Sequence, residues 1–393
     1  MSGETYGAGL PWFHAATTGT PLITTRTLDQ AKAEIQRRAD RALPPVGGVP
    51  PDDVREALAA IASFERDEWA LAFARLADRH LERAQEIEAT APADARREYW
   101  LAWRIFNFAR WPVENTPVKR FIYPRALAAF RNYGRLLDPP LEMVRIPFGS
   151  EVITGYLRVP AGPRPAPLVL GISGLDSRKE DVCAHSDAYL AAGLAVLALD
   201  MPGTGEAPEA LAPDGGAMFS RTLDYVATRS DLDASRVVVQ GRSWSGYWAA
   251  KLAVTERERL RGTVVHGGPI HGYFQPDWLG PSLDTLEYLY DYLPAKEALF
   301  GVTGREALLA HAPSLSLDAL GILDRPSAPM LVVNGAQDSQ IPIADAWRLL
   351  DGPGTRDAWI NPDGHHMGRS PEWPAKRIFE EVLLPWMRER LDA

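Results

Sequence analysis

A serine, an aspartate and a histidine in this chain have the order and the local surroundings of one hydrolytic site. Ser243 lies in Gly241-Arg-Ser-Trp-Ser-Gly246, directly after the β-branched run Val237-Val-Val239. A serine on a sharp turn between a strand and a helix exposes its hydroxyl, which is the geometry of a nucleophile elbow. The usual pattern has glycine two residues after the serine, and this chain has the small residue Ser245 there. The motif predicts that Ser243 is a nucleophile.

A serine hydroxyl needs a base, and the base needs a group that orients it. Ligands of a parallel α/β sheet lie at the carboxyl ends of its strands, so both groups are expected just after strands. Asp338 follows a predicted strand at 330–334, and His365 and His366 follow a predicted strand at 357–360. The order serine, aspartate, histidine is that of an α/β-hydrolase triad. We interpret Asp338 as the acid and His366 as the base.

Two choices within this triad stay open on the sequence alone. His365 adjoins His366, which is preferred because it lies two residues after Gly364 and precedes Met367. Asp363 is an alternative acid, although its place in the same loop as the histidines disfavours the geometry. Asp338 would also fit the role of a turn or helix-capping residue.

The tetrahedral intermediate of acyl transfer needs backbone N–H donors. The first predicted donor is the N–H of Trp244, directly after the nucleophile. The second is expected in the loop after a predicted strand at 167–172, where the sequence is Ser173-Gly-Leu-Asp176. The bend at Gly174 makes Leu175 the best candidate for this oxyanion hole.

The elements that would position these residues change character near residue 140. Apolar residues at helical spacing dominate the earlier part, and β-branched runs alternate with helices after it. That alternation is typical of a mostly parallel, doubly wound sheet. We predict an α/β-hydrolase fold, with a helical domain over 1–140 that forms part of the cap and a catalytic domain over 141–393. The helices are expected at about 27–41, 54–89, 93–109, 117–137, 179–192, 217–229 and 371–391.

The segment of about 267–324 is too long for a simple connection between two strands. We interpret it as a lid-like insertion with short helices. Its aromatic residues Tyr273, Phe274 and Trp278 are predicted to line a substrate pocket together with Trp244. Aromatic walls favour a bulky apolar, aromatic or polyketide-like acyl group. The alternative is that these rings only hold the two domains together.

Composition argues against several other classes of protein. The formal net charge of −9 disfavours nucleic acid or an acidic membrane surface as a partner. Cys183 is the only cysteine, which excludes an internal disulfide and a thiolate metal cluster. The sequence has no H-E-x-x-H motif and no G-K-[ST] phosphate loop, so neither a metal nor a cofactor is expected. We expect a small-molecule substrate.

The same sequence bears on location and assembly. No secretory signal is recognisable, and no apolar run is long enough to span a bilayer. A cytoplasmic location without a membrane partner is therefore expected. A homodimer is one of the assemblies that the sequence leaves open.

Three blocks of the sequence resemble one group of α/β hydrolases. They are Gly174-Leu-Asp-Ser-Arg-Lys-Glu-Asp181, Asp200-Met-Pro-Gly-Thr-Gly-Glu206 and Gly241-Arg-Ser-Trp-Ser-Gly246. The group includes the FrsA-like esterases, the 2,6-dihydroxypseudooxynicotine hydrolases and the fungal polyketide-shortening hydrolases. His366-Met-Gly368 is similar to the histidine end of the polyketide-shortening members. The chain departs from the group at Ser245 and at Met201, where glycine is usual.

The resemblance implies a cofactor-free serine hydrolase that has a helical region before its core. Members of the group cleave either esters or a carbon–carbon bond beside a ketone, so it implies one of these two reactions. A lyase or an acyltransferase that uses the same serine is an alternative, since the aromatic insertion would exclude water. A non-catalytic binding protein on a hydrolase fold is a further alternative.

Overall fold

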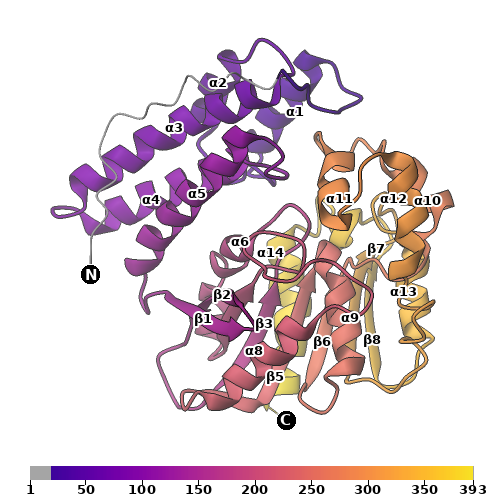
Figure 1. Cartoon of the computed structure of the whole chain (residues 1–393). Helices are drawn as coiled ribbons and strands as arrows, with labels where there is room; N and C mark the ends of the chain where they lie inside the picture. The colour runs from indigo at the N-terminus through magenta and orange to yellow at the C-terminus, as the bar shows by residue number, and fades with distance from the viewer. Residues whose placement is uncertain (1–18, 393) are drawn as a thin grey trace.

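The computed structural model describes residues 19–392, and its first part is a bundle of helices (Figure 1). These helices are α1 (Leu28–Asp40), α2 (Pro51–Ala59), α3 (Arg66–Ile87), α4 (Pro92–Ala109) and α5 (Pro117–Arg135). They pack through aromatic side chains at helical spacing, and Trp103 of α4 lies 4.8 Å from Phe130 of α5 between ring centres. The N-terminal region is helical, as predicted. We call residues 19–135 the N-terminal helical region.

The prediction of a single helix over 54–89 is wrong, because α2 and α3 are separated by a turn. The Glu65 carboxylate accepts the N–H of Glu68 at 2.7 Å and so caps the start of α3. The Leu22 N–H donates to the Phe64 carbonyl at 2.7 Å, which pairs the turn with an extended segment before α1. Both helices bury the same kinds of residue, so apolar spacing alone does not show the break between them.

Eight strands form one sheet in the order β1-β2-β4-β3-β5-β6-β7-β8. They are β1 (Glu142–Phe148), β2 (Glu151–Arg158), β3 (Ala166–Ile172), β4 (Ala195–Leu199), β5 (Leu232–Arg242), β6 (Gly262–His266), β7 (Met330–Gly335) and β8 (Arg356–Asn361). β2 pairs antiparallel with both β1 and β4, and all other neighbours are parallel. The predicted mostly parallel sheet is confirmed.

Helices cover both faces of this sheet, as a doubly wound fold requires. One face is covered by α8 (Ala217–Thr228), α9 (Gly246–Thr255) and α13 (Ile343–Leu350). The other is covered by α7 (Asp187–Ala191) and by the C-terminal helix, which runs from α14 (Ala375–Ile378) through a π-helical turn into α15 (Leu384–Asp392). The C-terminal helix begins four residues later than predicted, because Pro374 is its N-cap.

The helix predicted at 179–192 is also two helices, α6 (Lys179–Cys183) and α7. At the break, Ser186 donates its hydroxyl to the Cys183 carbonyl at 2.6 Å. The Arg158 guanidinium on β2 donates to the same hydroxyl at 2.9 Å and also pairs with Asp187. The helix is interrupted by contacts from a distant strand, which local periodicity does not reveal.

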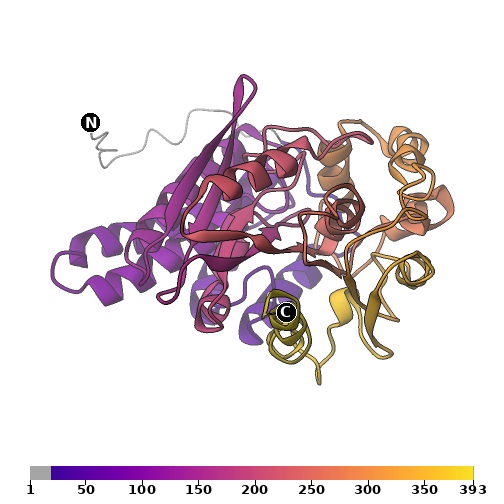
Figure 2. The ribbon, with the colours of Figure 1, turned by 90° about the horizontal axis from the view of Figure 1, so that it is seen from below.

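The predicted insertion lies between β6 and β7 and carries α10 (Pro276–Ser282), α11 (Tyr292–Phe300) and α12 (Arg305–His311). In Figure 1 these helices and the N-terminal helices both lie above the sheet. Figure 2, viewed from below, shows them at the right and at the left of the molecule. Trp111, after α4, stacks on Tyr288 of the insertion with ring centres 4.9 Å apart. The boundary between two domains at residue 140 stays a prediction.

Candidate active site

Ser243 lies on the sharp turn between β5 and α9, and its backbone has a φ of 54°. Non-glycine residues rarely adopt this left-handed conformation, and where they do the strain often marks a functional site. The turn is tight enough that a Cβ on Gly241 would lie 2.2 Å from the Ser245 carbonyl oxygen. Ser245 is fully buried, and its hydroxyl accepts the Arg242 N–H and donates to the Ile172 carbonyl, each at 2.8 Å. A serine therefore replaces the usual glycine without an unsatisfied polar group.

His366 lies against the serine hydroxyl, with its Nε2 2.7 Å from Ser243 Oγ. The histidine is buried, while Ser243 is partly exposed. The adjacent His365 is exposed and has no side-chain hydrogen bond to any described residue. Of the two histidines left open by the sequence, the structure brings His366 to the serine.

Asp338, at the carboxyl end of β7, lies on the other side of the imidazole, with its Oδ2 2.8 Å from His366 Nδ1. Its Oδ1 accepts the backbone N–H groups of Gln340 at 2.8 Å and Ile341 at 3.1 Å. Burial acts to raise the pKa of Asp338, but His366 and these two N–H groups outweigh it and hold the pKa below its ordinary value. Asp338 is thus an oriented, ionised carboxylate beside the imidazole.

The loop after β3 passes directly over the elbow. A Cβ on Gly174 would lie 3.3 Å from the Ser243 Cβ, and the Gly174 N–H is held by the Ser177 hydroxyl at 2.8 Å. Leu175 follows, and no described residue accepts a hydrogen bond from its N–H. The two predicted donors are thus in the two segments that meet at the elbow, Leu175 directly after Gly174 and Trp244 directly after Ser243. Their role as an oxyanion hole stays a prediction.

The aromatic residues predicted to line a pocket form a packed cluster. The Trp244 indole meets Tyr273 and Phe274 edge to face, with ring centres 6.5 and 6.1 Å apart, and both phenyl rings are fully buried. Trp278 is partly exposed, and its indole N–H donates to the Gln340 carbonyl at 3.4 Å. Tyr273 and Phe274 form part of the core of the insertion, and the predicted substrate-lining role of the four aromatic residues stays a prediction.

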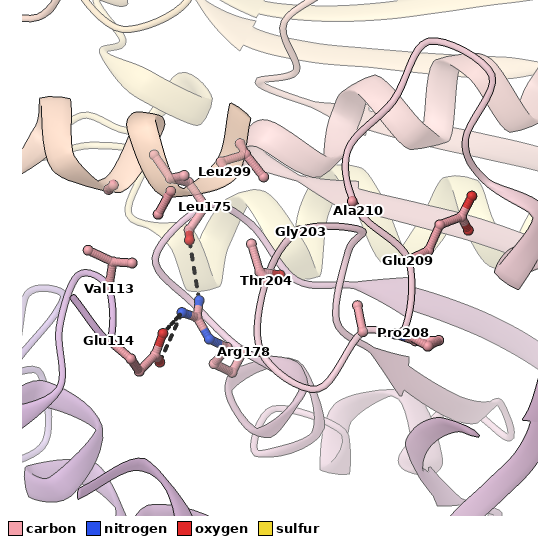
Figure 3. A pocket seen from close by; sticks show the side chains of 14 residues that line it. Val113, Glu114, Leu175, Arg178, Gly203, Thr204, Pro208, Glu209, Ala210 and Leu299 are labelled. Atoms are coloured by element: carbon pink, nitrogen blue, oxygen red, sulfur yellow. Dashed lines mark hydrogen bonds and ion pairs between the residues drawn. The ribbon is translucent and has the colours of Figure 1, made fainter. Parts of the chain in front are cut away.

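A cavity of about 400 Å³ does lie beside the loop after β3 (Figure 3). Its lining includes Val113 and Glu114 of the N-terminal helical region, Leu175 and Arg178, residues 203–205 and 207–210, and Ala295, Ala298 and Leu299 of α11. Figure 3 shows the Glu114 carboxylate paired with the guanidinium of Arg178, which also donates to the Leu175 carbonyl. The cavity is where the N-terminal helical region meets the insertion, and small, aliphatic and charged side chains line it, with no aromatic ring among them.

The sequence did not identify these lining residues. Gly203 and Thr204 follow β4, so their place after a strand was a usable signal. Ala295 and Ala298 carry no such signal, because an alanine on a helix is ordinary composition. Within residues 19–392 no cluster of three or more histidine, cysteine, aspartate or glutamate side chains is arranged to hold a metal. No helix in the same range has the length and apolarity needed to cross a membrane.

Residues 52–351 match the family model described as "Esterase FrsA-like". The chain belongs to the FrsA-like esterase family. It is 24% identical to esterase FrsA of Vibrio vulnificus over 76% of this chain and 75% of the relative. It is 28% identical to the α/β hydrolase ucsC of Acremonium over 58% of this chain. The matched region covers only about half, 52%, of the length of ucsC. The chain is 26% identical to the 2,6-dihydropseudooxynicotine hydrolase of Paenarthrobacter nicotinovorans, over 58% of this chain and 59% of the relative.

Solved structures share the fold of this FrsA-like chain. The 2,6-dihydroxy-pseudo-oxynicotine hydrolase has a TM-score of 0.74 at 21% identity and covers 88% of this chain and 94% of its own. AbyA5 has a TM-score of 0.71 at 22% identity and covers 92% of this chain and 97% of its own. The expected resemblance to this group is confirmed, and the protein is an enzyme of the α/β-hydrolase class.

Proposed function

We propose that the protein is a serine hydrolase in which Ser243, His366 and Asp338 act as a catalytic triad. The observation that carries the proposal is the continuous chain from Ser243 Oγ to His366 at 2.7 Å and from His366 to Asp338 at 2.8 Å, on a strained elbow. Nucleophile, base and orienting group are each within hydrogen-bonding distance of the next, as this chemistry requires.

The geometry supports the following sequence of steps. Ser243 Oγ attacks the carbonyl carbon while His366 Nε2 takes the hydroxyl proton, and Asp338 stabilises the imidazolium. The N–H groups of Trp244 and Leu175 donate to the oxyanion. His366 returns its proton to the leaving group, which is an alkoxide for an ester or a carbanion for a ketone. Water, activated by the same histidine, then hydrolyses the acyl-enzyme.

The cavity supports a substrate with an apolar group of moderate size. Its volume of about 400 Å³ would hold an extended or ring-containing acyl chain, including a polyketide-like one, against Val113, Leu175 and Leu299. Glu114, Arg178 and Glu209 add charged groups to the same wall. Relatives named as an esterase and as a hydrolase of 2,6-dihydropseudooxynicotine support acyl transfer to water. An ester and a carbon–carbon bond beside a ketone are both consistent with these names.

Replacing the nucleophile tests the triad. Ser243→Ala should lower kcat by ~10³-fold or more and should abolish labelling by a fluorophosphonate probe. His366→Ala should cause a comparable loss, whereas the exposed neighbour His365→Ala should leave kcat and KM close to wild type. Full activity in folded Ser243→Ala enzyme, or equal losses in the two histidine variants, would contradict the assignment.

Labelled water separates hydrolysis from transfer and elimination. With p-nitrophenyl esters and β-diketones of increasing chain length in H₂¹⁸O, hydrolysis puts ¹⁸O into the acid product. An acid product without the label would favour the lyase or acyltransferase alternative. The substrate class with the highest kcat/KM then distinguishes ester cleavage from carbon–carbon cleavage.

A further inference from the structure

The segment between α10 and α11, residues 284–291, links the N-terminal helical region to the candidate triad. We call it the strap. Arg26 donates to carbonyls of the strap, at 2.8 Å to Tyr288 and 3.0 Å to Leu289. Arg38 of α1 donates to the Glu287 carbonyl at 2.9 Å. The strap ends at Asp291, whose fully buried carboxylate forms two hydrogen bonds with Arg66 of α3, at 2.8 and 2.9 Å. The N-terminal helical region thus fixes the strap along its length.

From this fixed backbone, the Glu287 carboxylate reaches the two loops that carry His366 and Asp338. Its Oε1 accepts the backbone N–H of His366 at 3.2 Å. Its Oε2 accepts the hydroxyl of Ser339, the residue after Asp338, at 2.6 Å. Thr285 of the strap contacts the same Ser339 hydroxyl at 2.9 Å. One carboxylate therefore bridges the loop of the base and the loop of the acid.

The histidine loop needs such external contacts, because its own backbone is strained. Met367, directly after His366, has a φ of 64°. The N–H of Met367 is held by Asn334 at 3.0 Å, and the carbonyl of His366 is held by Arg369 at 2.9 Å. His266 Nε2 contacts the Met367 carbonyl at 2.9 Å, and Glu287 adds a contact on the N–H of His366 itself. At 3.2 Å this bond is longer than the strongest charge-assisted bonds, but it acts on the backbone that carries the imidazole.

We propose that Glu287 is a positioning residue through which the N-terminal helical region holds His366 and Asp338 in register with Ser243. The proposal rests on the proposed function, in which these three residues perform the chemistry. Glu287 acts through the backbone of His366 and the side chain of Ser339, and has no hydrogen bond to Ser243. The helical region is then part of the catalytic apparatus as well as a wall of the cavity.

Two substitutions of Glu287 separate the effect of its hydrogen bonds from the effect of its negative charge. Glu287→Ala removes the bridge, and kcat for a p-nitrophenyl ester should fall about 10–100-fold with KM little changed, since small misplacements of a catalytic group are costly. Glu287→Gln keeps an acceptor for the His366 N–H and a partner for Ser339, so kcat should stay within ~5-fold of wild type. A merely structural role would lower the amount of folded enzyme and leave kcat per active site unchanged.

The pH–rate profile adds a readout that only the charge can move. The groups around His366 are Asp338, Glu287, Arg369 and His266, and only Glu287 differs between the enzymes. Loss of a negative charge beside the imidazolium moves the acid limb of kcat/KM to lower pH. This shift should be of the same size in both Glu287 variants, although their kcat values differ.

Two neighbouring arginines of α1 test the contribution of the N-terminal helical region. Both arginines pair with Glu34, Arg37 at 2.7 and 2.8 Å and Arg38 at 2.8 Å. Among the described residues only Arg38 of the two also contacts the strap. Arg38→Met should lower kcat several-fold with an unchanged KM, and Arg37→Met should leave both unchanged. If Glu287→Ala does not fold, this pair still tests the proposal.

The outcomes distinguish this proposal from the proposed function. A folded Glu287→Ala enzyme with wild-type kcat and pH profile, or equal effects of the two arginine variants, would overturn the positioning role while Ser243→Ala remained inactive. An active Ser243→Ala enzyme would overturn the proposed function itself. Fluorophosphonate titration of each variant gives the concentration of active sites on which kcat is calculated.

Discussion

Lys179 and Lys296 are both fully buried, and their surroundings are opposite. The Lys179 ammonium, at the start of α6, lies 2.6 Å from Glu206, 3.0 Å from Glu180 and 3.1 Å from Asp200. Lys296 of α11 forms no ion pair with any described residue. Its Nζ is 2.5 Å from the Tyr273 hydroxyl and lies over the rings of two tyrosines, Tyr273 at 4.4 Å and Tyr292 at 4.1 Å.

The two environments shift the lysine pKa in opposite directions. Burial acts to lower the pKa of Lys179, but the carboxylates outweigh it and hold the pKa well above its ordinary value. Burial alone acts on Lys296 and places its pKa well below the ordinary value. The Tyr273 hydroxyl oxygen accepts from the Lys296 amine at 2.5 Å and from the Trp244 indole N–H at 3.2 Å.

The comparison shows how the two sides of the cavity are held together. The core beside the N-terminal helical region depends on a charged network, in which each partner is needed to offset the burial of the others. The insertion beside Trp244 depends on aromatic packing and on neutral hydrogen bonds. The two sides should therefore respond differently to loss of a lysine, to loss of a hydroxyl and to pH.

Removing Lys179 should have the largest effect on stability. Lys179→Met leaves Asp200 and Glu180 buried without their cation, which should lower the free energy of unfolding by about 3–5 kcal/mol. Chemical denaturation and the thermal midpoint measure the loss. Lys376→Met, at an exposed lysine 3.7 Å from Glu380, is the matched control and should change little. A loss as small as the control's would show that the buried carboxylates do not depend on Lys179.

The candidate triad could be predicted from the sequence, because its residues come directly after strands. Ser243, Asp338 and His366 each follow a strand, and the carboxyl ends of parallel strands converge at one edge of a sheet. The helix breaks at 60–65 and 184–186 were missed, because their local caps are stabilised by contacts from Leu22 and Arg158, which are distant in sequence. The spacing of apolar residues shows which face of a helix or strand is buried. It does not show which residue, distant in sequence, contacts that helix or strand.

The aromatic residues show the same limit at the candidate site. Composition showed that the insertion is rich in rings, and it did not show whether the rings face a cavity or one another. Tyr273 and Phe274 are fully buried against Trp244, whereas Ala295 and Ala298 line the cavity. Likewise, Glu287 meets His366 across 79 residues of sequence, so no local pattern relates them.

Removing the hydroxyl of Tyr273 should have an intermediate effect. Tyr273→Phe leaves the Lys296 amine and the Trp244 indole N–H without their shared partner, and unpartnered buried polar groups cost ~1–3 kcal/mol. Tyr247→Phe is the matched control, because the buried Tyr247 hydroxyl has no hydrogen-bond partner among the described residues and its ring also packs on Trp244. The control should be neutral or stabilising. Equal losses in the two variants would show that the Tyr273 hydroxyl does not hold this cluster.

Removing Lys296 should have the smallest effect near neutral pH, because Lys296 has no ion pair with any described residue to lose. Lys296→Met should keep the free energy of unfolding within ~1 kcal/mol of wild type or raise it, since methionine fills a similar volume without a polar group to desolvate. A loss as large as that of Lys179→Met would show that Lys296 is charged and paired in the folded protein.

The pH dependence of this small difference decides the charge state of Lys296. The folded pKa lies below the unfolded one, so between the two values the unfolded chain binds a proton that the folded chain does not. The free energy of unfolding of the wild type, minus that of Lys296→Met, should therefore rise with pH across this interval and level off above ~10.4, where the unfolded lysine is also neutral. Urea unfolding of both proteins at several pH values measures the difference, and groups common to both cancel. A difference that falls as pH rises would show that Lys296 is stabilised as an ammonium, as Lys179 is.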